Sequence, residues 1–278
     1  KHHGLVPDKV PEDIDLVIVP DAGSNDYEQH KEMQARGIDV LVIDHHICDR
    51  FSENAIVINN QMSENYPNKT LCGGAMVYKF CEAYDKTYGF DCAKTQIDLC
   101  ATSLVADMMD LKNPETRFYV KEGLRNITNV GLQAMIDVQE FSLKNYPKLI
   151  PTGISFYIAP LVNAIVRIGT RDEKILLFKS FIEGDEIVPS TKRGAKGKFE
   201  TVAEQSARTA VNARNRQETQ VKNVLEALNF KIRKNELFLN TVIFVPIDEE
   251  EFDSSLTGLI AMKICAQYKK PTIVARKN

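Results

Sequence analysis

Three short apolar runs in the first sixty residues constrain the fold of this chain more than any other feature. They cover residues 15–20, 40–43 and 55–59, and the polar stretch 28–36 between the first two has the character of a helix. Strands that alternate with helices form a parallel sheet with helices on both faces. We therefore expect an α/β fold built on a doubly wound parallel sheet, in which ligands bind beyond the carboxyl ends of the strands.

The rest of the chain is first helical and then α/β again. Apolar spacing predicts helices over 74–88, 93–109, 114–127, 153–167 and 171–181, then a Gly- and Lys-rich loop at 188–198 and a long helix from about 200 to 228. A strand, a helix and a strand follow at 241–245, 256–268 and 272–275. We expect three parts: an α/β domain over 1–185, a basic loop and connecting helix over 186–229, and part of a smaller α/β C-terminal domain over 230–278.

Side chains that bind metals follow two of the expected strands. Asp21 ends the first, and Asp44, His45 and His46 come directly after the second. Asp107 lies in an otherwise apolar segment, where a buried carboxylate needs a metal or a hydrogen-bonding partner. Carboxylates with an imidazole suit manganese or magnesium better than a structural zinc site. The alternatives are a turn with two exposed histidines, and an Asp107 that faces solvent at a helix end.

The net charge of −3 hides a basic segment. Residues 190–235 contain eleven Lys and Arg against four Glu, within a chain that is otherwise acidic. A patch of one sign suits a polyanion, because neutralised phosphates release their counterions. On the long helix the spacings of four and three place several polar side chains on one face. These are Arg208, Asn212, Asn215 and Arg216. A solvated helix face is the alternative.

Composition excludes several classes of protein. Apolar residues make up 44% and charged residues 26%, which is typical of globular chains. The six cysteines include no Cys-x-x-Cys pair, which argues against a zinc ribbon. By sequence we expect no apolar run to reach the roughly 18 residues of a membrane span, and no signal-peptide core begins the chain. We expect a cytoplasmic protein with no membrane partner.

Several motifs in order along the chain resemble one known family. Pro20-Asp21-Ala22-Gly23-Ser24, residues 38–46 ending in Asp44-His45-His46, and Val105-Ala106-Asp107 resemble the second, third and fourth motifs of the DHH phosphoesterase superfamily. The Gly-rich residues 71–74, residues 158–167, the Asn- and Arg-bearing long helix, and residues 256–274 are similar to the RecJ single-strand exonuclease branch. The family's first motif, expected before Asp21, and its C-terminal glycine-rich motif, expected after residue 278, are not found, which we interpret as truncation.

The resemblance implies a site with two divalent ions, Mn²⁺ or Mg²⁺, in the complete protein. By motif position Asp21 would bridge both ions, and His45 and Asp107 would bind the second. The resemblance also assigns Asp44 to orient His45, and His46 to assist beside the phosphate. Two residues of the 158–167 segment, Asn163 and Arg167, would grip a substrate phosphate.

The function that the resemblance implies is that of a RecJ-like 5′-to-3′ single-stranded DNA exonuclease. Two alternatives remain open: a DHH phosphodiesterase of short oligonucleotides or cyclic dinucleotides, and a catalytically inactive DNA-binding homologue. Single-stranded DNA is the expected partner, and roles in DNA repair and recombination follow from it. A single-strand-binding protein or a helicase as a further partner is an expectation that no residue of the sequence shows.

Overall fold

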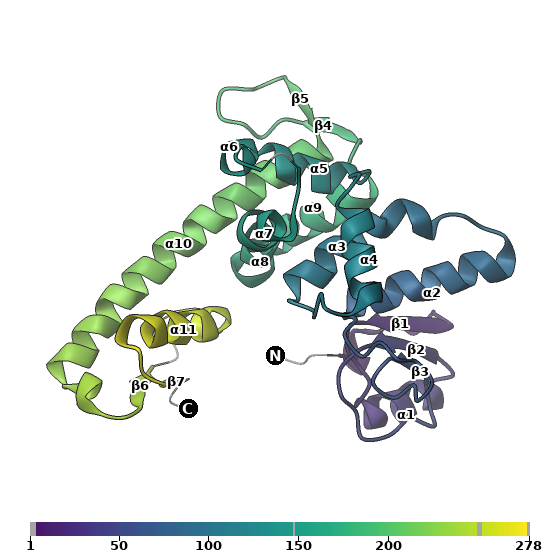
Figure 1. The fold of residues 1–278 in the computed structure, drawn as a ribbon, viewed down its shortest axis with the longest axis horizontal. Coiled ribbons are helices and arrows are strands. Elements are labelled where there is room, and N and C mark those ends of the chain that lie inside the picture. Colours follow the sequence, from purple (N-terminus) through teal and green to yellow (C-terminus); the bar gives the residue numbers. More distant parts are fainter. Residues whose placement is uncertain (1–3, 147, 249–251, 277–278) are drawn as a thin grey trace. The chain divides into compact units, whose positions relative to one another are not determined.

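The computed structural model describes residues 4–146, 148–248 and 252–276 (Figure 1). Contacts divide the chain into two compact units, the first with residues 1–133 and 140–159, the second with 134–139 and 160–278. The first unit contains a three-stranded sheet, and the second contains two sheets of two strands. The boundary between units thus falls near residue 160, earlier than the end at 185 that we expected for the first domain.

The sheet of the first unit is parallel, with strand order β1-β2-β3. Its strands are β1 (Leu16–Pro20), β2 (Asp39–Asp44) and β3 (Ile56–Asn59), and helix α1 (Tyr27–Ala35) connects the first two. In register, Pro20 lies opposite Ile43, and Asp44 lies opposite Asn59. The carboxyl ends of all three strands therefore meet at one edge, which confirms the predicted parallel α/β sheet.

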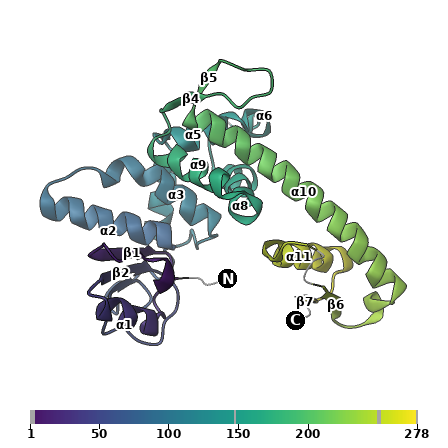
Figure 2. The ribbon, with the colours of Figure 1, turned by 180° about the vertical axis from the view of Figure 1, so that it is seen from behind.

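Helices cover both faces of this sheet. Val19, Val40 and Val42 pack in one core cluster with Met33 of α1. Helix α2 (Gly73–Tyr88) contacts β1 and β2, and Figures 1 and 2 show α1 and α2 on opposite sides of the sheet. The central strand β2 is largely buried, with Val40, Val42 and Ile43 in the core, which suits its continuous apolar run. Leu16 and Ile18 of β1 and Ile56 of β3 are exposed.

Helices α3 (Ile97–Ala106) and α4 (Pro114–Gly123) of the first unit are shorter than their sequence patterns predicted. The first unit also contains η1 (Pro7–Lys9), η2 (Ala93–Gln96), α6 (Glu140–Leu143) and α7 (Pro151–Gly153). Helix α5 (Val130–Asp137), like α6, was not expected from the sequence. The helix predicted over 93–109 begins as a 3₁₀ turn and ends at Ala106, since Met108 takes a left-handed conformation with φ of 55°.

A proline interrupts the helix predicted over 153–167. The π-helical turn η3 (Ile154–Ile158) directly precedes α8 (Ala159–Ile168), whose second residue is Pro160. Proline has no N–H for the regular ladder, and a π turn accommodates the missing bond. By length and composition, Pro151–Ile168 could span a membrane, which corrects the expectation that no stretch would suffice. Its buried residues, among them Ile158 and Leu161, are equally typical of a core helix.

After α8 the second unit contains a helix and a β-hairpin. Helix α9 (Arg171–Ile182) precedes β4 (Ile187–Pro189), which pairs antiparallel with β5 (Phe199–Thr201). The sequence predicted only a loop here, because strands of three residues are too short to show alternation. Helix α10 (Val202–Lys234) then begins at a capping box, in which the Thr201 and Glu204 side chains each bond the other's backbone N–H.

The chain then forms the predicted strand-helix-strand piece. After η4 (Leu237–Leu239) come β6 (Ile243–Ile247), η5 (Ser254–Leu256), α11 (Thr257–Tyr268) and β7 (Thr272–Arg276). The two strands pair in parallel. The later turns of α10 pack against them, with Leu228 and Ile232 in one buried cluster with Val245 and Ile260. This core explains why the second half of α10 is apolar on one side.

Candidate metal centre and active site

Three ligand side chains converge in the first unit beyond the carboxyl ends of its strands. Asp21 directly follows β1, His45 directly follows β2, and Asp107 directly follows α3. The Nε2 atom of His45 lies 3.3 Å from Oδ1 of Asp21 and 3.7 Å from Oδ2 of Asp107. Both carboxylates are exposed, while the His45 side chain is only 15% exposed. The structure thus brings together the three residues that the sequence suggested as metal ligands.

The backbone around Asp21 is held in an unusual conformation. Asp21 has φ of 59°, a left-handed value that non-glycine residues rarely adopt and that is often found at functional sites. Gly73, at the start of α2, lies against its side chain. A Cβ atom on Gly73 would lie only 2.5 Å from Cβ and Cγ of Asp21. The glycine therefore leaves the space that the Asp21 carboxylate occupies.

Asp44 is fully buried and anchors the segment that follows β2. Its Oδ1 accepts the backbone N–H groups of His45 at 2.7 Å and His46 at 3.2 Å, and its Oδ2 accepts the N–H of Ser24 at 3.2 Å. Oδ1 also lies 2.7 Å from Nδ1 of His46. Burial raises the pKa of Asp44, but these bonds outweigh it and lower the pKa to about 2.

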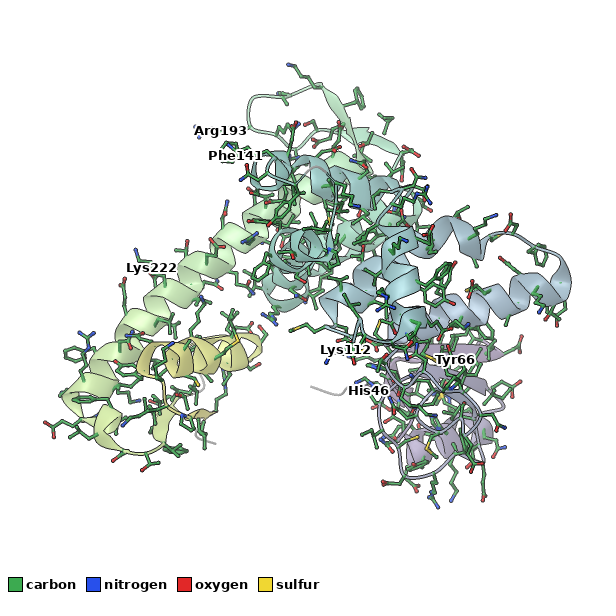
Figure 3. All side chains as sticks on the ribbon, viewed as in Figure 1. His46, Tyr66, Lys112, Phe141, Arg193 and Lys222 are labelled. Atoms are coloured by element: carbon green, nitrogen blue, oxygen red, sulfur yellow. The ribbon has the colours of Figure 1, made fainter. Side chains whose placement is uncertain are left out.

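This arrangement differs from the role that the resemblance assigned to Asp44. The carboxylate bonds the ring of His46 and only the backbone of His45. Its oxygens already accept four hydrogen bonds, so few lone pairs remain for a metal. Asp44 therefore orients His46, whose ring is half exposed at the edge of the unit (Figure 3).

The donor set of Asp21, His45 and Asp107 fits a divalent ion of the manganese or magnesium type. Two carboxylate oxygens and one imidazole nitrogen are ligands that Mn²⁺ accepts readily. The hydrogen bond to Asp21 raises the pKa of His45, against the opposing effect of its burial. A metal would replace the ring proton, because only the neutral imidazole binds a metal.

A cavity lies beside His45. It has a volume of about 610 Å³ and is lined by residues 22–26 and 44–47, including Asp44, His45 and His46. One ligand atom from each of Asp21, Asp44, His45 and His46 lies within 4.8 Å of the others. Of the three candidate ligands, only His45 lines this cavity.

The residues expected to bind substrate lie in the second unit. Asn163 and Arg167 are exposed on α8, one turn apart. Asn212 and Asn215 are exposed on α10. Arg193 in the hairpin loop and Lys222 on α10 also project into solvent (Figure 3). These polar and basic groups are exposed, and their role in substrate binding stays a prediction.

Arg208 and Arg216 of α10, two of the residues expected to bind substrate, are ion-paired. Arg208 lies 2.5 Å from Oε1 of the buried Glu200 and donates to the Thr191 hydroxyl at 3.0 Å. Arg216 donates to both carboxylate oxygens of Glu173 at 2.8 Å. The sequence pattern showed the spacing of these arginines and not their partners. Arg208 and Asn212 line a cavity of about 520 Å³ together with Lys192.

The Glu200 contacts predict how stability responds to acid. Burial raises the pKa of Glu200, but bonds from Gln205, the Thr191 N–H and Arg208 lower it to about 2. A lowered folded-state pKa adds stability above the unfolded value of 4.5, and that contribution is lost as pH falls from 4.5 toward 2. Glu200→Gln should therefore flatten the loss of unfolding free energy over this range, measured by urea titration. An equal slope in both proteins would contradict the assignment.

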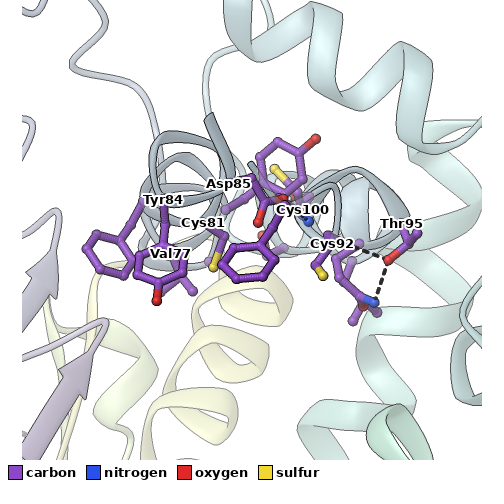
Figure 4. A pocket seen from close by; sticks show the side chains of 15 residues that line it. Val77, Cys81, Tyr84, Asp85, Cys92, Thr95 and Cys100 are labelled. Atoms are coloured by element: carbon purple, nitrogen blue, oxygen red, sulfur yellow. Dashed lines mark hydrogen bonds between the residues drawn. The ribbon is translucent and has the colours of Figure 1, made fainter. Parts of the chain in front are cut away.

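A second cavity in the first unit has a different character. It has a volume of about 900 Å³ and lies between α2 and the segment η2–α3, with an apolar lining that includes Val77, Tyr84 and Phe90 (Figure 4). Burial raises the pKa of the Cys81 thiol at its wall, so that thiol stays protonated and unreactive at neutral pH. This cavity is larger than the one beside His45, but its described lining residues form no metal-binding set. We therefore place the chemistry at Asp21, His45 and Asp107.

Sequence reasoning missed two buried residues beside the site. Ser24 and Asn59 are both about 1% exposed, and they hydrogen-bond each other at 2.8 Å. Asn59 ends β3, so the rule that ligands bind beyond the carboxyl ends of parallel strands could have indicated it. Ser24 lies inside one of the family motifs, but its contact with Asp44 could not be inferred from spacing.

Comparisons with known proteins agree with this geometry. Residues 1–109 match the DHH family, N-terminal domain. The chain is 40% identical over 279 residues to the putative SPbeta prophage-derived single-strand DNA-specific exonuclease YorK of Bacillus subtilis strain 168, with 100% of this chain and 48% of the relative covered. The chain thus spans about half the length of that curated relative.

Solved structures show the same fold. A crystal structure of exonuclease RecJ bound to manganese superposes with a TM-score of 0.73 at 20% identity, covering 98% of this chain and 64% of that one. RecJ from Thermus thermophilus in complex with Mn²⁺ gives a TM-score of 0.70 at 19% identity, covering 94% and 36%. At this identity the likeness establishes the fold alone.

Proposed function

We propose that this chain, whose residues 1–109 match the DHH family N-terminal domain, carries the catalytic centre of a single-stranded DNA exonuclease that uses two divalent ions. Mn²⁺ is the expected ion and Mg²⁺ its substitute, in line with the ions named for the RecJ structures of the same fold. The relative named a single-strand DNA-specific exonuclease, 40% identical along the whole chain, supports the substrate. Digestion from the 5′ end is part of the proposal.

The observation that carries the proposal is the convergence of Asp21 and Asp107 on Nε2 of His45. Asp21, His45 and Asp107 would hold the metal, which supplies Lewis-acid activation of water and neutralises charge on the scissile phosphate. The left-handed Asp21 and the adjacent Gly73 keep one carboxylate aimed at His45. These residues come from three separate elements, so only the folded chain assembles them.

The remaining polar residues would bind and orient the phosphate. His46 is half exposed, and its Nδ1 faces Asp44, so its Nε2 is the ring atom left to meet a phosphate oxygen. A neutral ring with its proton on Nδ1 offers Nε2 as an acceptor, and a protonated ring offers it as a donor. Arg167 and Asn163 would contact further phosphates, Arg167 through its planar fork of donors.

The direct test follows release of label from oligonucleotides. With Mn²⁺ present, the protein should release a labelled mononucleotide at once from a single strand labelled at the 5′ end. A 3′-labelled strand should instead give a ladder of shortened labelled products and lose its label last. A duplex of the same sequence should be degraded much more slowly. Hydrolysis of dinucleotides or cyclic dinucleotides in preference to the long strand would support the short-substrate alternative. Strand binding without hydrolysis would support the inactive homologue.

The basic hairpin loop gives a separate prediction for strand binding. Arg193 and Lys196 are exposed. Arg208 is less available to a phosphate, because it is ion-paired with the Glu200 carboxylate. Arg193→Gln with Lys196→Gln should flatten the slope of log affinity against log salt by about 1.4, since each single-strand phosphate contact contributes about 0.7. The matched control is Lys31→Gln with Lys94→Gln, two exposed lysines outside the basic segment. If both double variants gave the same slope, the hairpin loop would not contact the phosphates of the strand.

A wider role belongs to the same proposal. A protein that degrades single strands would act in DNA repair or recombination in the cytoplasm. Its companions would be a single-strand-binding protein or a helicase, because these present or generate single strands.

A further inference from the structure

Asn59 occupies a position that the proposed chemistry does not use directly. It ends β3, lies opposite Asp44 in the sheet register, and is 1% exposed. A buried side-chain amide needs partners for its donors and its acceptor, because an unmet polar group in the interior destabilises the fold. The partners of Asn59 therefore show what this side chain holds in place.

Each polar atom of the Asn59 side chain has a defined partner. Nδ2 donates to the Ser24 hydroxyl oxygen at 2.8 Å and to the carbonyl oxygen of His46 at 2.8 Å. Oδ1 accepts the backbone N–H of Gln61 at 2.8 Å. Because Oδ1 faces a donor and Nδ2 faces a carbonyl, the amide has one orientation only.

These partners connect Asn59 to the Asp44–His46 pair from two sides. Ser24, one partner, donates its backbone N–H to Oδ2 of Asp44 at 3.2 Å. His46, the other, has its Nδ1 only 2.7 Å from Oδ1 of Asp44. The amide thus joins the loop after β1 to the peptide of His46, and the carboxylate between them bonds the ring.

We infer that Asn59 is a positioning residue, which acts through Ser24, Asp44 and the His46 backbone to fix the direction of the His46 ring. The inference rests on the proposed function, in which Nε2 of His46 meets the substrate phosphate. Groups that orient the residues of a metal site often matter in this way, and loss of such a partner typically costs 10–100-fold in activity. The contacts of the Asn59 side chain run to Ser24, His46, Gln61 and, at 3.9 Å, the Sγ atom of Cys48, so the metal ligands Asp21 and Asp107 should keep their places.

The positioning also selects the tautomer of His46. An ionised carboxylate can only accept a hydrogen bond, so the ring nitrogen that faces Asp44 must carry the proton. In the neutral form of the His46 ring, the hydrogen should therefore lie on Nδ1. If Asn59 fixes the geometry, this preference should weaken when its amide is changed.

The test compares two neighbouring asparagines. Asn59→Asp keeps the side-chain shape but places a carboxylate oxygen against the His46 carbonyl oxygen. Asn60→Asp is the matched control, because Asn60 is also buried and its Nδ2 donates instead to the Asn68 carbonyl at 3.2 Å. On single-stranded DNA with Mn²⁺, Asn59→Asp should lower kcat by about 10–100-fold, with little change in KM or in Mn²⁺ affinity. The Asn60→Asp protein should keep the parental kcat.

A second measurement does not depend on activity. Long-range ¹H–¹⁵N correlation of the His46 ring should show the Nδ1–H tautomer in the parent and in Asn60→Asp, and a mixture in Asn59→Asp. Ser24→Ala, a smaller change that removes one partner of the amide, should shift the spectrum in the same direction and provides a variant if Asn59→Asp does not fold. If the parent fails to degrade DNA, the proposed function is wrong, and the spectra still decide the inference. An unchanged tautomer in both Asn59→Asp and Ser24→Ala would overturn it.

Discussion

Replacing Asp21 with asparagine should lower Mn²⁺-dependent hydrolysis of single-stranded DNA by roughly a thousandfold, since a metal supplies several kcal/mol of stabilisation to the reacting phosphate. Asparagine has the same shape as aspartate and tolerates the left-handed φ of 59° at this position. It lacks only the charge that faces His45 at 3.3 Å. The loss should therefore come from weaker metal binding, measured by titration calorimetry with Mn²⁺ beside the rate of nucleotide release.

The control for this substitution is Asp49→Asn. Asp49 is an exposed carboxylate five residues after Asp44, and its replacement makes the same change in net charge. The control should keep both the rate and the Mn²⁺ affinity of the parent, and both variants should unfold at the parental temperature because each side chain is exposed. Full activity in Asp21→Asn would remove Asp21 from the metal centre.

Replacing Gly73 with alanine should cost about a hundredfold in the same activity, although Gly73 carries no functional group. The new Cβ atom would lie 2.5 Å from Cβ and Cγ of Asp21, too close for either residue to stay in place. A shift of about 1 Å in a catalytic group typically costs about a hundredfold. Mn²⁺ affinity should fall along with the rate, which calorimetry would show.

Gly258→Ala is the matched control for Gly73→Ala. Gly258 also lies in the first turn of a helix, α11, but a Cβ atom there would meet nothing within 4 Å. Alanine is the better helix former, so this variant should be as stable as the parent or slightly more stable. If Gly73→Ala bound Mn²⁺ as the parent does, the tight approach of α2 to Asp21 would have no role in the site.

The parallel sheet and the candidate site at its edge could be predicted from the sequence. Apolar runs separated by a helical stretch permit few topologies, and parallel strands bring their carboxyl ends to one edge. The end of each strand can be identified from the residues next to it, and parallel pairing then brings these ends to the same edge. Asp21 and His45 could therefore be expected at one site, and the structure places them 3.3 Å apart.

The hydrogen-bond and ion-pair partners of the polar side chains could be identified only in the tertiary structure. Asp44 contacts the ring of His46, and Asn59 connects His46 to Ser24. On the basic helix, Arg208 forms an ion pair with Glu200. Asn59 lies 35 residues from Ser24 along the chain, and no periodicity in the sequence encodes a contact over that separation. Hydrogen bonds of this kind form only after packing has brought strand ends and loops within about 3 Å, so they depend on the whole arrangement of sheet, helices and loops.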